Sequence, residues 1–222
     1  MEHSFGAYFI SGVDTNCGKT YVTSNLASYI HHRGVSVITQ KPIQTGCEVV
    51  ADDLIEHRRA MGTGLLPEDK EGRTCSYLFK TAATPQLAAT LEGRTVDVEK
   101  IDRDTRFLLS RYHMVLVEGV GGLMVPLNDE YLTIDYVASR RLPMILVVTS
   151  RFGGINHAFM SIEACKNHDV DLRVIVYNRF PDVDRTVADK NFVTIKDFAL
   201  SLFPHITMVD FRSSDSFWGL EL

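Results

Sequence analysis

The sequence has few cysteines and no long apolar run. Its 222 residues include four cysteines, and none of them form a C-x-x-C pair: Cys17, Cys47, Cys75 and Cys165. Neither a disulfide framework nor a cysteine metal cluster is therefore expected, and a reducing compartment is indicated. No segment reaches the roughly 18 uninterrupted apolar residues of a membrane-spanning helix. The opening MEHSFGAYFIS lacks the basic and apolar regions of a signal peptide, so we expect a soluble, cytoplasmic protein.

Basic charge is also scarce. The net charge is −5, and no run of Lys and Arg is longer than two residues. Nucleic acid and acidic membranes are therefore not expected partners, whereas this balance is compatible with small-molecule chemistry. Hydrophobic residues make up 45% of the chain, which is enough for a buried core, and no repeat or linker divides it. We expect a single α/β nucleotide-binding domain over residues 1–222.

Short apolar runs rich in β-branched residues recur along the chain. They lie at 7–11, 35–39, 114–118, 143–149, 173–177 and, more weakly, 206–210. Helical patterns lie at 19–33, 97–111, 132–141, 155–168 and 185–202, whereas 47–95 is irregular and is expected to hold loops and short helices. Strands nearly unbroken by polar residues are typical of parallel sheets covered on both faces. The alternation predicts a doubly wound, mainly parallel α/β sheet with helices on both faces.

The first candidate site follows the first apolar run, because ligands of such sheets bind beyond the carboxyl ends of the strands. The segment GVDTNCGKT at 12–20 is similar to the phosphate loop G-x-x-x-x-G-K-[ST], but Val13 stands where the pattern has its first glycine. Lys19 can neutralise the β- and γ-phosphates, and Thr20 can offer its hydroxyl to Mg²⁺. A helix that begins there points its N–H groups at the phosphates, so the segment predicts nucleotide binding in a phosphate-loop NTPase fold.

Charged residues also follow the second and third runs. In QKPIQTG at 40–46, Lys41 and Thr45 can face the same cleft as Lys19, although a solvated lysine before a turn is the alternative. Glu118 ends an apolar strand, where a carboxylate is costly unless it is paired or binds a cation, so it is a candidate Mg²⁺ ligand. The glycines after it allow backbone N–H groups to approach an anion. Asp52 and Asp53 are further metal candidates, and the sequence does not say which one points inward.

Two other strand ends carry weaker signals. Residues 153–156, within SRFGGINHA, open a helix whose N–H groups can receive a carboxylate, or they simply cap that helix. Asn178 ends a strand, where its amide can read an adenine edge or serve as a turn residue. His157 lies within the predicted helix and is expected to pack or cap rather than to catalyse.

Taken together, these segments resemble the dethiobiotin synthetase family. GVDTNCGKT is similar to the family's G-T-D-T-x-x-G-K-T apart from Val13, KPIQTG to its K-P-[VIL]-x-[ST]-G, and VEGVGGLMVPL to its V-E-G-x-G-G-x-x-x-P-L. LPMILVVTSRFGGINHA resembles the family's fourth strand and following helix, and the ordered matches cover most of residues 8–160. The resemblance implies an ATP- and Mg²⁺-dependent ligase that closes a cyclic urea on 7,8-diaminopelargonic acid with CO₂. Its products would be dethiobiotin, ADP and phosphate, formed through a carbamate and a carbamic–phosphoric anhydride.

The resemblance also implies roles for individual residues. The implied catalytic residues are Lys41, Lys19 and Thr15, and the implied metal ligands are Thr20, Asp53 and Glu118. ATP would be bound by Asp14, Thr15, Asn16, Cys17, Gly18, Lys19, Thr20, Tyr21, Glu118, Gly121 and Asn178. The other substrates would be bound by Thr15, Lys41, Thr45, Gly153, Gly154, Ile155 and Asn156. In the family the last four come from the second subunit, so the resemblance implies a homodimer with its active site at the subunit interface.

Two departures from the family pattern qualify this expectation. Asn16 stands where many relatives carry an acid near the substrate amines, and the tail ITMVDFRSSDSFWGLEL lacks the proline-bearing turn that relatives place against the base. The alternatives are a related phosphate-loop ATPase that acts on another substrate and a partner-regulated ATPase switch. A switch would be expected to carry a second lysine early in the loop and a membrane- or DNA-binding surface. The early loop instead holds Asp14.

Overall fold

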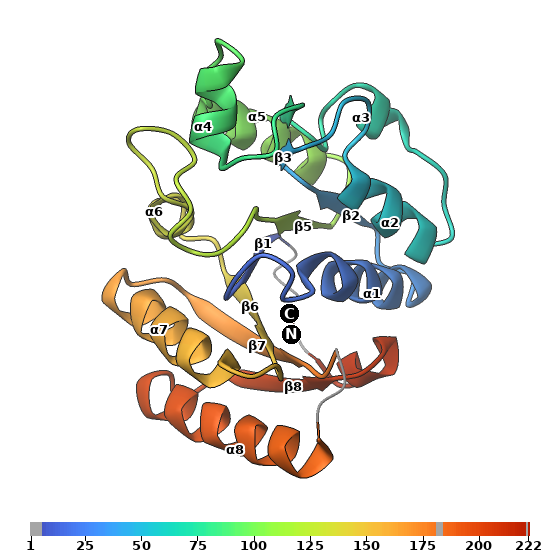
Figure 1. Ribbon diagram of the computed structural model, residues 1–222. Helices are drawn as coiled ribbons and strands as arrows, with labels where there is room; N and C mark the ends of the chain where they lie inside the picture. Colours follow the sequence, from blue (N-terminus) through green and yellow to red (C-terminus); the bar gives the residue numbers. More distant parts are fainter. Residues whose placement is uncertain (1–5, 181–183, 221) are drawn as a thin grey trace.

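A six-stranded parallel sheet forms the centre of the protein (Figure 1). The computed structural model describes residues 6–180, 184–220 and 222, and all statements below concern these residues. The strands lie in the order β2-β5-β1-β6-β7-β8, and each neighbouring pair is parallel. Their bounds are β1 Ala7–Gly12, β2 Val37–Gln40, β5 Met114–Glu118, β6 Met144–Thr149, β7 Leu172–Asn178 and β8 Thr207–Phe211.

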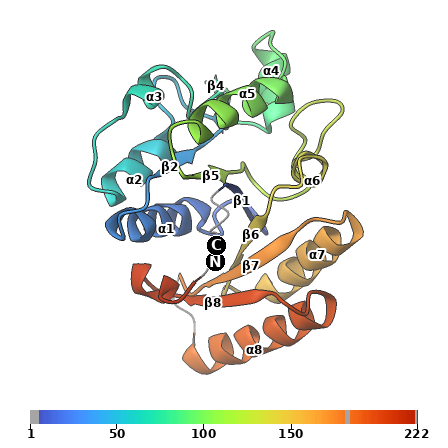
Figure 2. The same cartoon turned by 180° about the vertical axis from the view of Figure 1, so that it is seen from behind.

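Helices cover both faces of this sheet because alternate residues of each strand point to opposite sides. Ile10 packs with α1 (Lys19–His32) and the 3₁₀ helix η1 (Ser214–Phe217). Phe9, its neighbour in β1, packs on the other face. Buried residues on that second face come from α4 (Pro85–Leu91), α5 (Val98–Leu109), α6 (Thr133–Ser139), α7 (Gly154–Asn167) and α8 (Arg185–Leu202). The opposite view in Figure 2 shows the same layers from behind. The predicted doubly wound α/β fold is confirmed.

The sequence prediction missed a second, two-stranded sheet. Strand β3 (Ile43–Thr45) pairs in parallel with β4 (Tyr77–Phe79), and Ile43 lies opposite Tyr77. Strands this short show no readable alternation, and their pairing depends on a partner far along the chain. The segment 40–46, interpreted from the sequence as a loop, therefore carries a strand in its second half.

The rest of the irregular region folds into short helices, as expected. These are α2 (Asp52–Ala60), α3 (Pro67–Lys70) and α4 (Pro85–Leu91), and α2 packs against α1. The other predicted strands and helices are confirmed with boundaries shifted by a few residues. Helix α7 starts at Gly154, before Asn156, because Gly153 adopts the left-handed φ of +80° at the N-cap. None of the described helices has both the length and the apolar character needed to cross a bilayer.

Strand register brings the functional segments together. Ile10 of β1 lies opposite Glu118 of β5, so the phosphate loop leaves β1 beside that carboxylate. Gln40 of β2 lies opposite Val117, which places Lys41 one position further along, next to Glu118. The carboxyl ends of three adjacent strands therefore deliver their charged residues to one edge of the sheet.

Candidate active site

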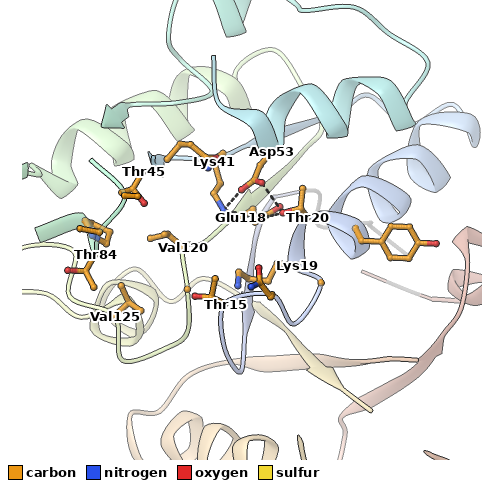
Figure 3. A pocket seen from close by; sticks show the side chains of 18 of the residues that line it. Thr15, Lys19, Thr20, Lys41, Thr45, Asp53, Thr84, Glu118, Val120 and Val125 are labelled. Carbon is orange, nitrogen blue, oxygen red and sulfur yellow. Dashed lines mark hydrogen bonds and ion pairs between the residues drawn. The ribbon is translucent and has the colours of Figure 1, made fainter. Parts of the chain in front are cut away.

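An open cavity of about 940 Å³ lies at this edge of the sheet (Figure 3). Its walls come from the phosphate loop and the start of α1, from the segments after β2 and β5, and from α2 and α4. It gathers most of the residues singled out from the sequence: Thr15, Asn16, Gly18, Lys19, Thr20, Tyr21, Lys41, Thr45, Asp53, Glu118 and Gly121. A cavity of this size suits a ligand as large as a nucleotide.

The phosphate loop closes tightly on itself. A Cβ atom on Gly12 would lie 2.3 Å from the sulfur of Cys17, so the loop needs a glycine at the end of β1 rather than at position 13. Asn16 has a φ of 60°, a conformation that Asn tolerates better than most side chains. Gly18 has a φ of 94°, and a Cβ there would lie 2.1 Å from Nδ2 of Asn178. The shifted glycine is thus a packing requirement of this loop.

Lys19 lies over the loop, with 7% of its surface exposed. Its Nζ donates to the backbone oxygen of Asp14 at 2.9 Å. Burial lowers the pKa of Lys19, and the nearby Lys41 ammonium lowers it further. The negative charge of an anion in the cavity would counter both effects by favouring the ammonium form, which makes this lysine a natural partner for phosphate oxygens.

Lys41 is held by three acceptors. Its Nζ lies 2.6 Å from Oδ2 of Asp53, 3.0 Å from Oε1 of Glu118 and 2.9 Å from the backbone oxygen of Gly119. An ammonium has three N–H donors, so these contacts use all of them. Burial alone would lower the pKa of Lys41, but the two carboxylates outweigh it and raise the pKa. Lys41 is therefore a fixed positive charge at the floor of the cavity.

Three oxygen donors converge beside Lys41. The hydroxyl oxygen of Thr20 lies 3.0 Å from Oδ1 of Asp53 and 3.0 Å from Oε1 of Glu118, and its single O–H donates to one of them at a time. Asp53 faces the cavity, whereas Asp52 is exposed, so the structure resolves which of the two acids points inward. Hard oxygen donors of this kind fit Mg²⁺, which keeps several waters and phosphate oxygens in its shell. Within the described ranges no cluster of three His, Cys, Asp or Glu forms a complete metal site. Waters and phosphate oxygens would therefore have to complete the coordination shell of the ion.

Glu118 has a second partner that was given no role from the sequence. The Nε2 atom of His57 lies 2.8 Å from Oε2 of Glu118, and both side chains are fully buried. Burial would raise the pKa of Glu118, but the charge of Lys41 and the hydrogen bond from His57 together lower it well below its usual range. The available signal was the spacing of Asp53 and His57, which places both residues on one face of α2.

Comparisons with known proteins identify the family. A family model described as an AAA domain matches residues 6–206. The ATP-dependent dethiobiotin synthetase BioD 2 of Haemophilus influenzae is 43% identical over 82% of this chain and 95% of its own length. The ATP-dependent dethiobiotin synthetase BioD of Chlorobaculum tepidum is 49% identical over 81% of this chain and 75% of its own length. The chain belongs to the dethiobiotin synthetase family.

Solved structures agree on the fold. The hydrogenase maturation factor HypB of Archaeoglobus fulgidus matches 98% of this chain and 88% of its own, with a TM-score of 0.54 and 16% identity. The signal recognition particle receptor FtsY of Elizabethkingia anophelis matches 97% of this chain with a TM-score of 0.52 and 12% identity. This chain spans 63% of that FtsY chain. At these identities the matches support the fold alone, which this member of the dethiobiotin synthetase family shares.

Several residues that the family resemblance implicated lie outside the cavity. Asp14 forms an ion pair with Arg151 instead, and Cys17 within the loop is buried. Asn178 is 2% exposed, donates to the oxygen of Cys17 at 3.0 Å and accepts from the N–H of Phe180 at 3.1 Å. Its adenine-reading role stays a prediction. The helix start formed by Gly153, Gly154, Ile155 and Asn156 does not line the cavity of its own chain.

The cavity also has walls that were not predicted. They are formed by Gln44, Ala82, Ala83, Thr84, Pro85, Val120, Val125 and Phe180. Most of these side chains are apolar, so sequence reasoning that looked for charge and hydroxyl groups passed over them. Thr84 and Pro85 carried a usable signal, because Pro at the first position marks a helix start. Phe180 packs against Tyr21, whereas Ala83, Pro85 and Val125 form an apolar side of the cavity that suits the alkyl part of a ligand.

Proposed function

We propose that this protein is an ATP-dependent dethiobiotin synthetase. It would join CO₂ to the two amines of 7,8-diaminopelargonic acid, close a cyclic urea, and release dethiobiotin, ADP and phosphate. The proposal is supported by membership of the family and by relatives at 43% and 49% identity that carry this name. The observation that carries it in this chain is the convergence of Lys19, Lys41 and Glu118 on one cavity.

The nucleotide would lie along the phosphate loop. Lys19 and the backbone N–H groups at the start of α1 would neutralise its phosphates. The donor set of Thr20, Asp53 and Glu118 would hold Mg²⁺, because these three oxygens already converge within hydrogen-bonding distance. When bound, the ion would supply positive charge to the β- and γ-phosphate oxygens. Tyr21 and Gly121 lie where they would border the nucleotide.

The chemistry would depend on placement rather than on a strong base. One neutral amine reacts with CO₂ to give a carbamate and a proton that passes to water. The carbamate is already anionic and needs no further activation. A carbamate oxygen then attacks the γ-phosphorus and ADP leaves, after which the second amine attacks the carbamate carbon and phosphate leaves. The three N–H donors of Lys41 already have acceptors, so it would act through its positive charge beside the carbamate and the transferring phosphoryl group. Thr45 and Thr15 would help to hold these groups. No Ser-His-Asp arrangement is required.

The rest of the substrate would use the apolar side of the cavity. Its alkyl chain would run along Ala83, Pro85 and Val125, which line that side. Its carboxylate would be received by the helix start at residues 153–156 of a second subunit, since this segment does not line the cavity of its own chain. We therefore propose a homodimer that works in the cytoplasm, in which each chain acts as one domain.

Release of ADP by the purified protein with MgATP, bicarbonate and diaminopelargonic acid tests the reaction. We expect turnover that requires the diamine and yields dethiobiotin. Turnover independent of the diamine would overturn the proposal and favour an ATPase switch. Mixing inactive Lys41→Ala and inactive Asn156→Ala proteins tests the dimer, because a mixed pair would regain one site with both residues intact. No recovery from mixed pairs shown to have formed would contradict the shared site.

A further inference from the structure

His57 lies directly behind the candidate metal ligand Glu118. It sits on α2, one turn after Asp53, and its side chain is fully buried. The two residues face the same edge of the sheet: Asp53 contacts Thr20 and Lys41 from the cavity side, while His57 reaches Glu118 from beneath. A single helix thus contributes a candidate ligand and the partner of another one.

The two oxygens of Glu118 have different partners. Oε1 faces the hydroxyl of Thr20 and the ammonium of Lys41, both at 3.0 Å, whereas Oε2 accepts from Nε2 of His57 at 2.8 Å. Since an ionised carboxylate only accepts, Nε2 must carry the proton. The other ring nitrogen, Nδ1, is buried and has no hydrogen-bonding partner among the described residues. Among the described residues, the ring of His57 therefore makes its one hydrogen bond with Glu118.

The different partners of its two oxygens fix the orientation of the Glu118 carboxylate. Without a donor at Oε2, Glu118 could rotate about its last side-chain bond or present both oxygens to a cation. Mg²⁺ demands near-octahedral geometry, and partners of a ligand commonly set the ligand's orientation. Resting on the proposed function, we propose that His57 is a positioning residue that holds Oε2 of Glu118 away from the cavity. Oε1 is then the single oxygen offered to the metal.

Substitutions of His57 separate orientation from packing. Gln carries an amide N–H at about the reach of Nε2, Asn has the same amide on a shorter side chain, and Leu fills the space without a donor. We expect His57→Gln to retain most of the metal affinity. We expect His57→Leu and His57→Asn to weaken it by about 10–100-fold, the range seen when such outer partners are lost.

The measurement is the titration of Mn²⁺, followed by the electron paramagnetic resonance signal of the free ion, in the presence of ADP. Midpoints of urea unfolding for each variant show whether the fold is retained. Equal Mn²⁺ affinity in wild type and His57→Leu would overturn the proposal, as would equal losses in the Gln and Asn variants. If His57→Leu does not fold, the comparison of Gln with Asn decides.

Mn²⁺ binding and dethiobiotin formation, measured side by side, distinguish the role of His57 from the proposed function. If the wild type binds Mn²⁺ and ADP but forms no dethiobiotin, the proposed function fails while the effect of His57 on the metal can still be measured. If dethiobiotin is formed and the variants bind metal equally, only the role of His57 is refuted.

Discussion

Lys41 and Glu118 lie 77 positions apart in the sequence, yet the Nζ of one lies 3.0 Å from Oε1 of the other in the interior. The register of β2 and β5 makes this contact possible, because it sets the two strand ends side by side. Asp53 completes the group from α2 at 2.6 Å from the same ammonium. The candidate site is therefore a small network of opposite charges in which Lys41 and Glu118 are buried and Asp53 borders the cavity.

Replacing Lys41 tests the proposed role of its positive charge beside the reacting groups. We expect Lys41→Ala to lower kcat by about 10²-fold or more, the scale for losing a preorganised electrostatic donor. The reason is that its charge sits at the floor of the cavity, where water does not compensate for it. Steady-state ADP release measures the effect, and Lys80→Ala, at a lysine that is 69% exposed, is the matched control. A near-normal rate for Lys41→Ala would refute the assigned role.

The neighbouring acids Asp52 and Asp53 offer a matched pair. Asp53→Asn should raise the Mg²⁺ concentration for half-maximal activity by about tenfold or more, since it removes a candidate ligand oxygen. Asp52→Asn should leave that concentration unchanged within about twofold, as expected of an exposed position. Activity measured over a Mg²⁺ series distinguishes the two variants. If both variants raise that Mg²⁺ concentration alike, the lost negative charge at the start of α2 is responsible, and not the loss of a metal ligand.

The buried pair of Arg58 and Asp69 predicts how stability depends on pH. Arg58 donates to Asp69 at 2.8 and 2.9 Å, and the side chains are 2% and 1% exposed. Burial would raise the pKa of Asp69, but the hydrogen bonds and charge of Arg58 outweigh it and lower the pKa below its usual range. The resulting stabilisation is present above the unfolded-state pKa and is lost as pH falls through the folded-state pKa.

We therefore expect Asp69→Asn to lower the free energy of unfolding at pH 7 by about 3–5 kcal/mol, because Arg58 is left without its counterion. The difference from wild type should shrink below about pH 4, where the unfolded wild-type chain takes up the proton. Urea unfolding at a series of pH values provides the measurement. Glu56→Gln, in an exposed pair with Arg59, serves as the control and should change little. A difference that stays constant down to the lowest pH at which both proteins fold would count against the pair.

Gly18 and Gly34 separate backbone strain from steric contact. Both have positive φ, +94° and +80°, but a Cβ on Gly18 would meet Asn178 at 2.1 Å, whereas one on Gly34 would meet no atom of the described residues within 4 Å. Gly34→Ala should cost about 1–2 kcal/mol of stability through the backbone alone. Gly18→Ala should cost more and should also weaken ATP binding, because the loop must move. Urea unfolding and calorimetric titration with ATP test both; equal effects would contradict the close contact at Gly18.

Much of the fold was readable from the sequence because its signals are local. Unbroken β-branched runs and helical spacing marked the elements that build the sheet and its covering layers, and β1 and α8 were found almost to the residue. The pairing of β3 with β4 was missed because three-residue strands carry no period of their own. The apolar wall around Val120 and Val125 was also missed, since no local sequence pattern distinguishes a residue that lines a cavity from one in the core.

By itself, the sequence determined that G-K-T lies between a strand and a helix and that Lys41 and Glu118 stand at the ends of strands. It also determined that the ordered motifs match one family. These facts depend on neighbours along the chain. Only the tertiary structure decided that Asp53 rather than Asp52 turns inward, that Asn178 supports the loop at Cys17, and that His57 holds Glu118. Each of those contacts joins segments far apart in sequence, and sheet register and helix rotation, rather than residue type, set which side chains meet.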